Sequence, residues 1–457
     1  MNRLKYILII SFILLASCKI GQKYKEPEMN IPPSFEARGM TKGSTADIGW
    51  STLYSDSVLH RLIATALDHN KDMLAATARI KEMAANKRIS FANMFPEIGG
   101  EVAGQREYTN YGGNTKNFDP EVRANLNMTW ELDIWGKLRW ANEAGVAAYL
   151  QTVEAQRALQ LTIVAEVAQA YFELKSLDRE LEIVRQTLEA RREGVNFAKL
   201  RYEGGLTSEI PYRQSLVELA RTETLIPNLE NEIKLKENDL FVLVGEFPSG
   251  SIARGDDITH QQVPQSLPVD LPSSLLKRRP DMIQAEQSLI EANANVGIAY
   301  TEMFPSLRLT GRLGGENSEL ADFVKSPTWY IAGALTGPIF NMGKNKARHN
   351  AAKAVYEQEV YAYEKSVLEA FKEVNNSINT FNKMKDVYRS QQALYNSAKS
   401  YYELARLQYV NGIVSYIEVL DSQRQLFDAE IALNTAILNE LVSVVILYKA
   451  LGGGLIE

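Results

Sequence analysis

The chain repeats itself once, and this internal repeat constrains its fold more than any other feature of the sequence. Phe95-Pro96 recurs as Phe304-Pro305, at an offset of 209 residues. Further along, five pairs recur at an offset of 207: Gly136 and Gly343, Tyr202 and Tyr409, Gly205 and Gly412, Ser208 and Ser415, and Gly245 and Gly452. We therefore expect two copies of one structural unit, residues 57–245 and residues 281–452.

Residues 1–17 have the features of a secretory signal peptide. Arg3 and Lys5 give a basic start, the run from Ile7 to Leu15 is apolar, and small residues follow. This run is shorter than the ~20 residues of a membrane-spanning helix, and we expect no later segment to cross a membrane as a helix.

Cys18 is the only cysteine, so disulfides within the chain are excluded. Its position after Leu15-Ala16-Ser17 resembles the bacterial lipobox, which predicts a diacylglycerol and an N-acyl chain on Cys18. The alternative is an ordinary signal peptide with a chance cysteine. Lys19 occupies the place where an inner-membrane retention signal usually has Asp, which implies anchoring in the outer membrane.

Three further segments lie outside the two copies. Residues 18–56 contain three prolines and predict an extended leader running from the lipid anchor. Residues 246–280 are rich in proline without helical periodicity and predict an ordered connector or collar. Residues 453–457 form a short tail. The formal net charge of −6 argues against nucleic-acid binding.

Each copy contains two segments in which apolar and polar residues alternate, as in strands with one apolar and one polar face. The clearest runs from Val122 to Asp133. The expected strands are residues 97–109, 121–133, 306–315 and 328–340. Each is long enough for the ~9 to 11 residues that cross a bilayer. Amphipathic hairpins packed on a soluble core are the alternative.

Long helices are predicted by a heptad pattern that begins at Val167 and stays in phase in both copies. The expected long helices are residues 138–203, 208–245, 344–410 and 415–451. The first would be roughly 100 Å long at 1.5 Å per residue. Each copy also opens with a shorter helix, residues 57–93 and 282–303, which a Phe-Pro pair ends. Arg278-Arg279-Pro280-Asp281 is best explained as the start of the second.

In each copy, a glycine-containing turn joins the two long helices into a hairpin. Gly204 and Gly205 end the first helix of one copy, and Asn411 with Gly412 ends its counterpart. Ser208 and Ser415 then predict N-caps for the returning helices.

Four strands cannot close a sheet, yet a sheet in lipid must leave no open edge. A trimer would supply twelve strands around a polar lumen and place twelve long helices around one axis. The predicted fold class is mainly α with a β-barrel contribution: two tandem repeats of a strand hairpin plus a long helical hairpin, with a trimer forming a twelve-stranded transmembrane barrel on a twelve-helix α-barrel.

Motifs along nearly the whole mature chain carry a family resemblance: Trp50…Leu53…Asp56…Leu59…Leu62…Ala66-Leu67…Asn70…Leu74, Phe95-Pro96, Trp130-Glu131-Leu132-Asp133-Ile134-Trp135-Gly136-Lys137, Arg278-Arg279-Pro280-Asp281, Phe304-Pro305, and Gly412…Val419-Leu420-Asp421-Ser422-Gln423-Arg424. The chain resembles the TolC-like outer-membrane efflux proteins, in their lipoprotein branch of the NodT/OprM type. This resemblance implies a homotrimeric exit duct in the bacterial outer membrane, extending into the periplasm. Its partners would be a periplasmic adaptor, an inner-membrane pump of the RND type and outer-membrane lipid.

The resemblance also implies where the duct closes. Relatives close it with acidic side chains on the last helix, which match Glu418 and Asp421 here, while Tyr409 matches a tyrosine of the closing contacts. Three copies would form rings of like charge and should raise the pKa of these carboxyls. Solvated carboxylates favoured by the helix dipole are the alternative. The turns at Gly204, Gly205, Asn411 and Gly412 would contact the adaptor and pump.

An enzyme is not expected, because His60, His69, His260 and His349 lack metal-ligand spacing and no nucleotide or nucleophile motif occurs. The expected cargo is small toxic compounds or drugs. Metal efflux and protein secretion remain alternatives on the same scaffold, as does a purely structural coiled-coil lipoprotein of the envelope.

Overall fold

The computed structural model describes residues 19–35, 41–42, 49–110, 116–261, 268–269, 276–317 and 325–454. The predicted signal peptide and Cys18 lie outside these residues. The chain divides into two compact units that cut across the sequence repeat, because each unit takes segments from both copies. Unit 1 contains Met1–Met29, Ala78–Val153 and Gln284–Lys365; unit 2 contains Asn30–Thr77, Glu154–Ile283 and Ser366–Glu457.

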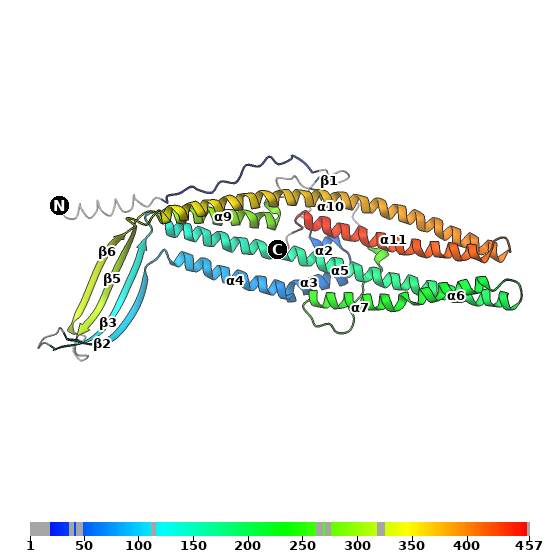
Figure 1. Cartoon of the computed structure of the whole chain (residues 1–457), viewed down its shortest axis with the longest axis horizontal. Coiled ribbons are helices and arrows are strands. Elements are labelled where there is room, and N and C mark those ends of the chain that lie inside the picture. Colours follow the sequence, from blue (N-terminus) through cyan, green and yellow to red (C-terminus); the bar gives the residue numbers. More distant parts are fainter. Residues whose placement is uncertain are drawn as a thin grey trace. The chain divides into compact units, whose positions relative to one another are not determined.

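Unit 1 contains a four-stranded antiparallel sheet in the order β2-β3-β5-β6 (Figure 1). Its strands are β2 (Glu97–Asn110), β3 (Lys116–Leu132), β5 (Ser306–Asn317) and β6 (Pro327–Thr336). β6 ends at Thr336 and not at residue 340 as expected, because Gly337 and Pro338 follow and proline cannot donate to a strand ladder.

The strand register places apolar residues of all four strands on one face of the sheet. Val102 pairs with Ala124, Leu126 with Leu313, and Leu313 with Trp329. The apolar side chains on this face are strongly exposed: Ile98, Val102, Leu126, Leu313, Trp329, Ile331 and Leu335. The opposite face is polar and contains an ion pair between Arg123 and Glu101 at 3.3 Å. The alternation predicted from the sequence is therefore a property of the whole sheet.

The leader packs against unit 1 through Trp140, which is only 1% exposed. The indole N–H of Trp140 donates to the carbonyl oxygen of Ile20 at 2.8 Å, and the Lys19 ammonium lies 3.2 Å from the ring centroid. Lys19 also forms an ion pair with Glu143. Gly297, on α9 (Pro280–Thr301), faces the same indole so closely that a Cβ atom there would overlap it. The first described residues of the chain are thus held at a defined place.

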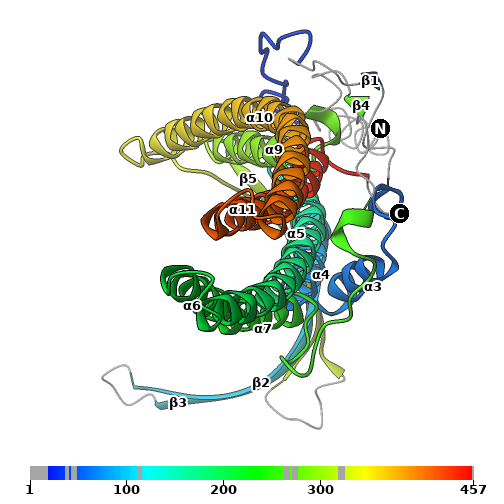
Figure 2. The same ribbon diagram turned by 90° about the vertical axis from the view of Figure 1, so that its right-hand side faces the viewer.

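Unit 2 is built on helices. It contains α2 (Trp50–Leu53), α3 (Ser57–His69), α6 (Ile210–Glu223), α7 (Leu225–Leu243), η2 (Ile258–His260), α11 (Tyr416–Ala450) and parts of α4 (Lys71–Ala92), α5 (Lys137–Glu203) and α10 (Lys344–Val410). Figures 1 and 2 show α11 returning alongside α10, and α6 with α7 returning alongside α5. The largest core joins α3, α5, α7, α10 and α11 and includes Leu59, Phe172 and Leu447, which are fully buried.

Two helices expected to be continuous are broken. The expected helix 57–93 is α3 and α4, because Asn70 leaves the helical conformation and its side-chain oxygen accepts from the N–H groups of Asp72 and Met73 at 2.9 and 3.2 Å. The expected helix 208–245 is α6 and α7, separated at Thr224. Pro227 explains this break, since proline has no N–H for the carbonyl one turn earlier and its ring clashes with that carbonyl.

The leader and connector also contain more regular structure than expected. α2 lies within the predicted leader, and η2 lies within the connector. β1 (Thr41–Lys42) of the leader pairs in parallel with β4 (Pro268–Val269) of the connector. Arg279 precedes α9 and pairs with the carboxylates of Asp281 and Glu373 at 2.7 and 2.6 Å.

By length and composition, α11 is apolar enough to cross a membrane, contrary to our expectation that no later segment would qualify. Half of its most apolar stretch is buried within the fold. Leu441, Val444 and Leu447 of this helix belong to the core of unit 2. These contacts are those of a core helix.

Candidate functional site at the helical turns

The two predicted turns of unit 2 have the same backbone geometry. In the first, Gly205 has a φ of +70° and donates to the carbonyl of Tyr202, while Leu206 donates to Arg201, both at 2.9 Å. In the second, Gly412 has a φ of +76° and donates to Tyr409 at 3.0 Å. Ile413 then donates to Gln408 at 2.9 Å. Both turns are Schellman motifs, which place a residue with positive φ directly after the helix.

Neither serine caps its returning helix through its hydroxyl group. α6 begins at Ile210, two residues after Ser208, with Pro211 in its first turn and no side-chain cap. Ser415 precedes α11, but its hydroxyl makes no cap hydrogen bond. The predicted N-cap is therefore wrong at Ser208, whereas Ser415 occupies the N-cap position of α11 without a side-chain hydrogen bond.

A small apolar cluster lies behind the turns and connects both hairpins. It consists of Ala198 from α5, Tyr409 from α10, and Tyr416, Val419 and Leu420 from α11, with Tyr212, Tyr402 and Val414 packed against it. Gly194 allows α5 to approach, because a Cβ atom there would lie 2.6 Å from the Tyr416 hydroxyl. The structure thus brings the ends of the two copies together within one chain.

Tyr409 lies inside this cluster and is 8% exposed. Its ring centroid is 5.8 Å from Phe197 and 5.2 Å from Tyr416, and the Arg201 guanidinium lies 5.1 Å above the ring. Burial raises the pKa of the Tyr409 hydroxyl, although Arg201 partly opposes this effect. In the single chain, Tyr409 therefore packs the hairpins together.

Glu418 and Asp421 lie on the first turns of α11 and make different contacts. Glu418 is exposed and accepts a hydrogen bond from the Tyr401 hydroxyl on α10 at 3.2 Å. Asp421 is half-buried and accepts from Arg424 at 2.9 Å and from Gln425 at 2.7 Å. Each carboxylate is held at a fixed place beside the second turn.

The sequence did not single out Tyr401, Arg201 or Gly194. Tyr401 lies 17 residues before Glu418, so only the three-dimensional hairpin brings the two together. The contact of Arg201 with the Tyr409 ring likewise depends on the packing of α5 against α10. Gly194 gave a usable signal, because glycine inside a long helix costs about 1 kcal/mol relative to alanine and indicates close packing.

Among the described residues, no group of three or more His, Cys, Asp or Glu side chains could hold a metal ion. Cys18, the predicted lipidation site, lies outside these residues.

The model of the outer membrane efflux protein family matches residues 62–246 and 271–453. The chain belongs to this family. The two matched segments correspond to the two copies of the internal repeat, so each copy is one instance of the family's unit.

Individual relatives are similar over most of the chain. The cation efflux system protein CusC of Escherichia coli K12 is 31% identical over 357 residues, which cover 76% of this chain and 77% of CusC. The probable outer membrane lipoprotein SilC of Salmonella typhimurium is 31% identical over 79% of both chains.

A solved structure shows the same fold. The open state of the MtrE outer membrane channel of Neisseria gonorrhoeae superposes with a TM-score of 0.90 and 28% identity, covering 96% of this chain and 98% of MtrE. The predicted family, the two-repeat fold with its four-stranded sheet, and the function as an outer-membrane efflux channel are confirmed. The chain is a channel component of the bacterial outer membrane and not an enzyme.

Proposed function

We propose that three copies of this chain close into one exit duct, which carries cargo from an inner-membrane pump through the outer membrane. The four-stranded sheet carries this proposal. One of its faces is apolar and exposed, the other is polar, and β2 and β6 form its two edges. Because an open sheet edge in lipid costs several kcal/mol per backbone group, the edges must pair with those of neighbouring copies. Three copies give a twelve-stranded barrel with a polar lumen.

The duct is anchored by lipid on Cys18. The lipobox-like residues before it support this assignment, as does the description of the relative SilC as an outer membrane lipoprotein. The contacts of Lys19 and Ile20 with Trp135, Trp140 and Glu143 hold the following residues beside the junction of β3 and α5. The lipid would therefore enter the membrane next to the end of a membrane-crossing strand.

The partners are a periplasmic adaptor and an inner-membrane pump of the RND type, which contact the turns at Gly204, Gly205, Asn411 and Gly412. Exposed apolar side chains beside these turns support a protein contact: Leu206 and Ile413 are each 71% exposed. Patches of this kind mark interaction sites on soluble surfaces.

The gate consists of Glu418 and Asp421, repeated around the trimer axis, with Tyr409 as a packing residue behind them. Rings of carboxylates attract cations to a lumen and narrow it. The hydrogen bonds from Tyr401 to Glu418, and from Arg424 and Gln425 to Asp421, support fixed carboxylate positions.

The cargo is small toxic compounds or drugs. Metal cations are a second candidate, because the relative CusC is described as a cation efflux protein. Deleting the gene and comparing accumulation of ethidium and of copper ions separates the two: the cargo is the compound whose accumulation rises, and restoring the gene should reverse that rise.

The decisive experiment is planar-bilayer conductance of the full-length lipoprotein. We expect a Glu418→Gln, Asp421→Asn double variant to open to larger conductances and to select cations more weakly. The matched control is Glu203→Gln, Glu209→Gln, which removes the same charge beside the first turn and should leave both properties unchanged.

Each other outcome is informative. A native pore unaffected by the Glu418 and Asp421 changes would place the gate elsewhere. A folded preparation that forms no pore would overturn the duct and favour a structural envelope lipoprotein.

A further inference from the structure

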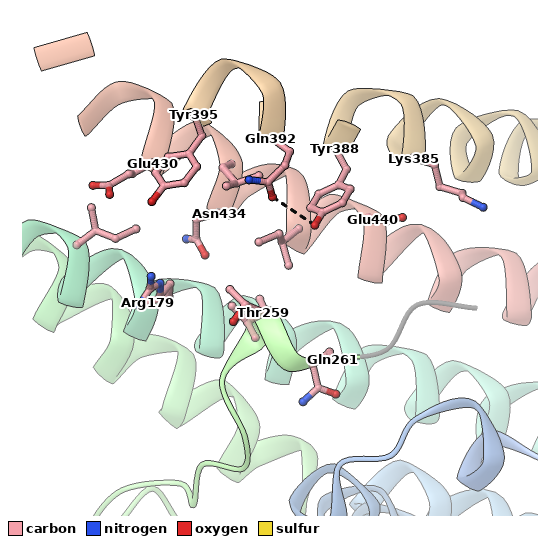
Figure 3. Close-up of a pocket in the computed structure, with 14 residues that line it drawn as sticks. Arg179, Thr259, Gln261, Lys385, Tyr388, Gln392, Tyr395, Glu430, Asn434 and Glu440 are labelled. Atoms are coloured by element: carbon pink, nitrogen blue, oxygen red, sulfur yellow. Dashed lines mark hydrogen bonds between the residues drawn. The ribbon is translucent and has the colours of Figure 1, made fainter. Parts of the chain in front are cut away.

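Unit 2 contains a cavity of about 420 Å³ that lies apart from the helical turns (Figure 3). It is lined by α5, α10, α11 and η2, through residues that include Arg179, Ile183, Tyr395, Glu430, Asn434 and Ile437. Its volume lies within the range of roughly 300 to 1,000 Å³ typical of small-molecule sites.

One buried polar atom in this cavity has no partner. Asn434 is 3% exposed, and its amide nitrogen donates to the carbonyl and hydroxyl oxygens of Ser176 at 2.9 and 3.0 Å. These two bonds fix the orientation of the amide, so the side-chain oxygen is the atom left over. That oxygen makes no hydrogen bond in the described part of the chain. Leaving a buried acceptor unpaired costs about 1 to 3 kcal/mol, which a ligand with a donor would recover.

Two carboxylates of α11 line the same cavity. Within the described ranges, no hydrogen bond or ion pair reaches the carboxylate of Glu430 or of Glu440. Burial raises the pKa of both carboxyls, although Arg179 and Lys399 oppose this effect at Glu430, as do Lys385 and Arg389 at Glu440. Arg179 and Lys385 also line the cavity, but each has another contact: Arg179 pairs with Glu182 at 2.7 Å, and the Lys385 ammonium lies 5.3 Å from the centroid of the Phe381 ring.

The unsatisfied groups are thus acceptors, and they are arranged for one cation. Glu430 and Asn434 are four residues apart on α11, a spacing that puts their Cβ atoms about 6 Å from each other on one face. Tyr395 of α10 lines the same end of the cavity (Figure 3). Carboxylate, amide oxygen and aromatic ring are the groups that recognise an ammonium ion.

A metal ion does not fit this cavity, because the described residues contain no group of three or more His, Cys, Asp or Glu side chains that could hold one. The apolar side chains of Ile183, Leu433 and Ile437 instead favour a ligand with a hydrocarbon body. We propose that this cavity binds a small organic ammonium ion, whose charged head sits between Glu430 and the Asn434 side-chain oxygen and whose apolar part packs on Ile183 and Ile437. This site is independent of the proposed gate.

The test uses 2-phenylethylammonium as the probe and the full-length lipidated protein in detergent, with binding followed by saturation-transfer NMR and calorimetry. We expect saturable binding that Glu430→Gln weakens at least about tenfold, because a charge-assisted hydrogen bond is lost. Asp428→Asn removes an exposed carboxylate from the same helix outside the cavity, and should change the affinity less than about twofold.

Two further measurements make the result decisive. The neutral analogue 2-phenylethanol should bind at least about tenfold more weakly than the ammonium probe. Equal binding of the two, no saturable binding to the native protein, or an unchanged affinity in Glu430→Gln at an unchanged melting temperature would each overturn the proposal. Because conductance is not measured, failure here leaves the proposed duct and gate untouched.

Discussion

The ammonium group of Lys175 lies 3.2 Å from the carboxylate of Asp56, and both side chains are almost completely buried. Asp56 also accepts hydrogen bonds from the Tyr171 hydroxyl at 2.8 Å and from the Gln261 amide at 3.1 Å. Its other oxygen caps α3 by accepting from the N–H of Val58 at 2.8 Å. One carboxylate therefore connects the leader, α3, α5 and the connector.

Removing the charge of Asp56 should destabilise the fold more than removing the charge of its ion-pair partner Lys175. Asp56→Asn leaves the Lys175 ammonium buried without an anion, and we expect a loss of about 3 to 5 kcal/mol in unfolding free energy. Lys175→Met leaves the carboxylate its other donors and should cost less. The double variant should cost less than the sum, because the two groups interact. Denaturant unfolding followed by circular dichroism measures all three.

The matched control is an exposed ion pair on α5, the helix that contains Lys175. Arg192 lies 2.7 Å from Glu189, and both are largely exposed. Arg192→Ala should cost no more than about 1 kcal/mol. Equal losses in Arg192→Ala and Asp56→Asn would contradict the importance of the buried pair.

The pKa of the Asp56 carboxyl predicts how the stability of the fold changes as the pH falls. Burial alone would raise the pKa of Asp56, but the hydrogen bonds from Tyr171 and Val58 and the charge of Lys175 outweigh it and hold the pKa below its ordinary value. A lowered pKa stabilises the folded state above the ordinary value of about 3.9, and this contribution is lost as the pH falls through the folded-state pKa. Between pH 7 and pH 3 the melting temperature of Asp56→Asn should fall less than that of the native protein. Parallel melting curves would contradict this assignment.

Much of the fold could be predicted from the sequence because it depends on periodicity. The alternation from Val122 to Asp133 predicted a two-faced strand, and the heptads after Val167 predicted a long helix that the structure has at Lys137–Glu203. The predicted helices 57–93 and 208–245 did not include the breaks at Asn70 and Thr224, although Pro227 is a sequence signal for the second break. Asn70 breaks the helix through its own side-chain cap, which competes locally with the helical conformation.

The candidate site could be predicted only in part. Positive-φ glycines leave a direct signal in the sequence, so both turns were found. Contacts between helices leave no such signal in the sequence. The hydrogen bond from Tyr401 to Glu418, for example, depends on the packing of α10 against α11. The burial of Tyr409 depends on Phe197, Arg201 and Tyr416, which come from two other helices.

Trp140 should control whether the leader stays attached to unit 1. Gly297→Ala places a methyl group against the rigid indole and should displace it, releasing Ile20 and Lys19. We expect limited proteolysis to cut near residues 19–25 at least about tenfold faster, reflecting a free-energy change of 1.4 kcal/mol or more. Trp140→Phe, which loses only the indole donor and some packing, should give a smaller increase. Unchanged cleavage in Gly297→Ala would show that the leader is held by other contacts.

The two turns should respond equally to substitution, since they have the same geometry. Gly205→Ala and Gly412→Ala each put a side chain at positive φ, and no atom lies within 4 Å of the new Cβ. Each should therefore cost only the backbone strain of about 1 to 2 kcal/mol. Thermal melting measures this loss, and Gly412→Asn should recover part of it, because asparagine tolerates this conformation better.

Substitutions of two other glycines distinguish the cost of backbone strain from the cost of steric overlap. Gly104→Ala has neither a positive φ nor a neighbour within 4 Å, and should be close to neutral. Gly245→Ala has a positive φ of +77° and would also drive its Cβ into the carbonyl of His69, so it should cost clearly more than either turn variant. If Gly412→Ala instead proved as costly as Gly245→Ala, a neighbouring copy would have to pack directly against the turn, because the single chain leaves that space empty.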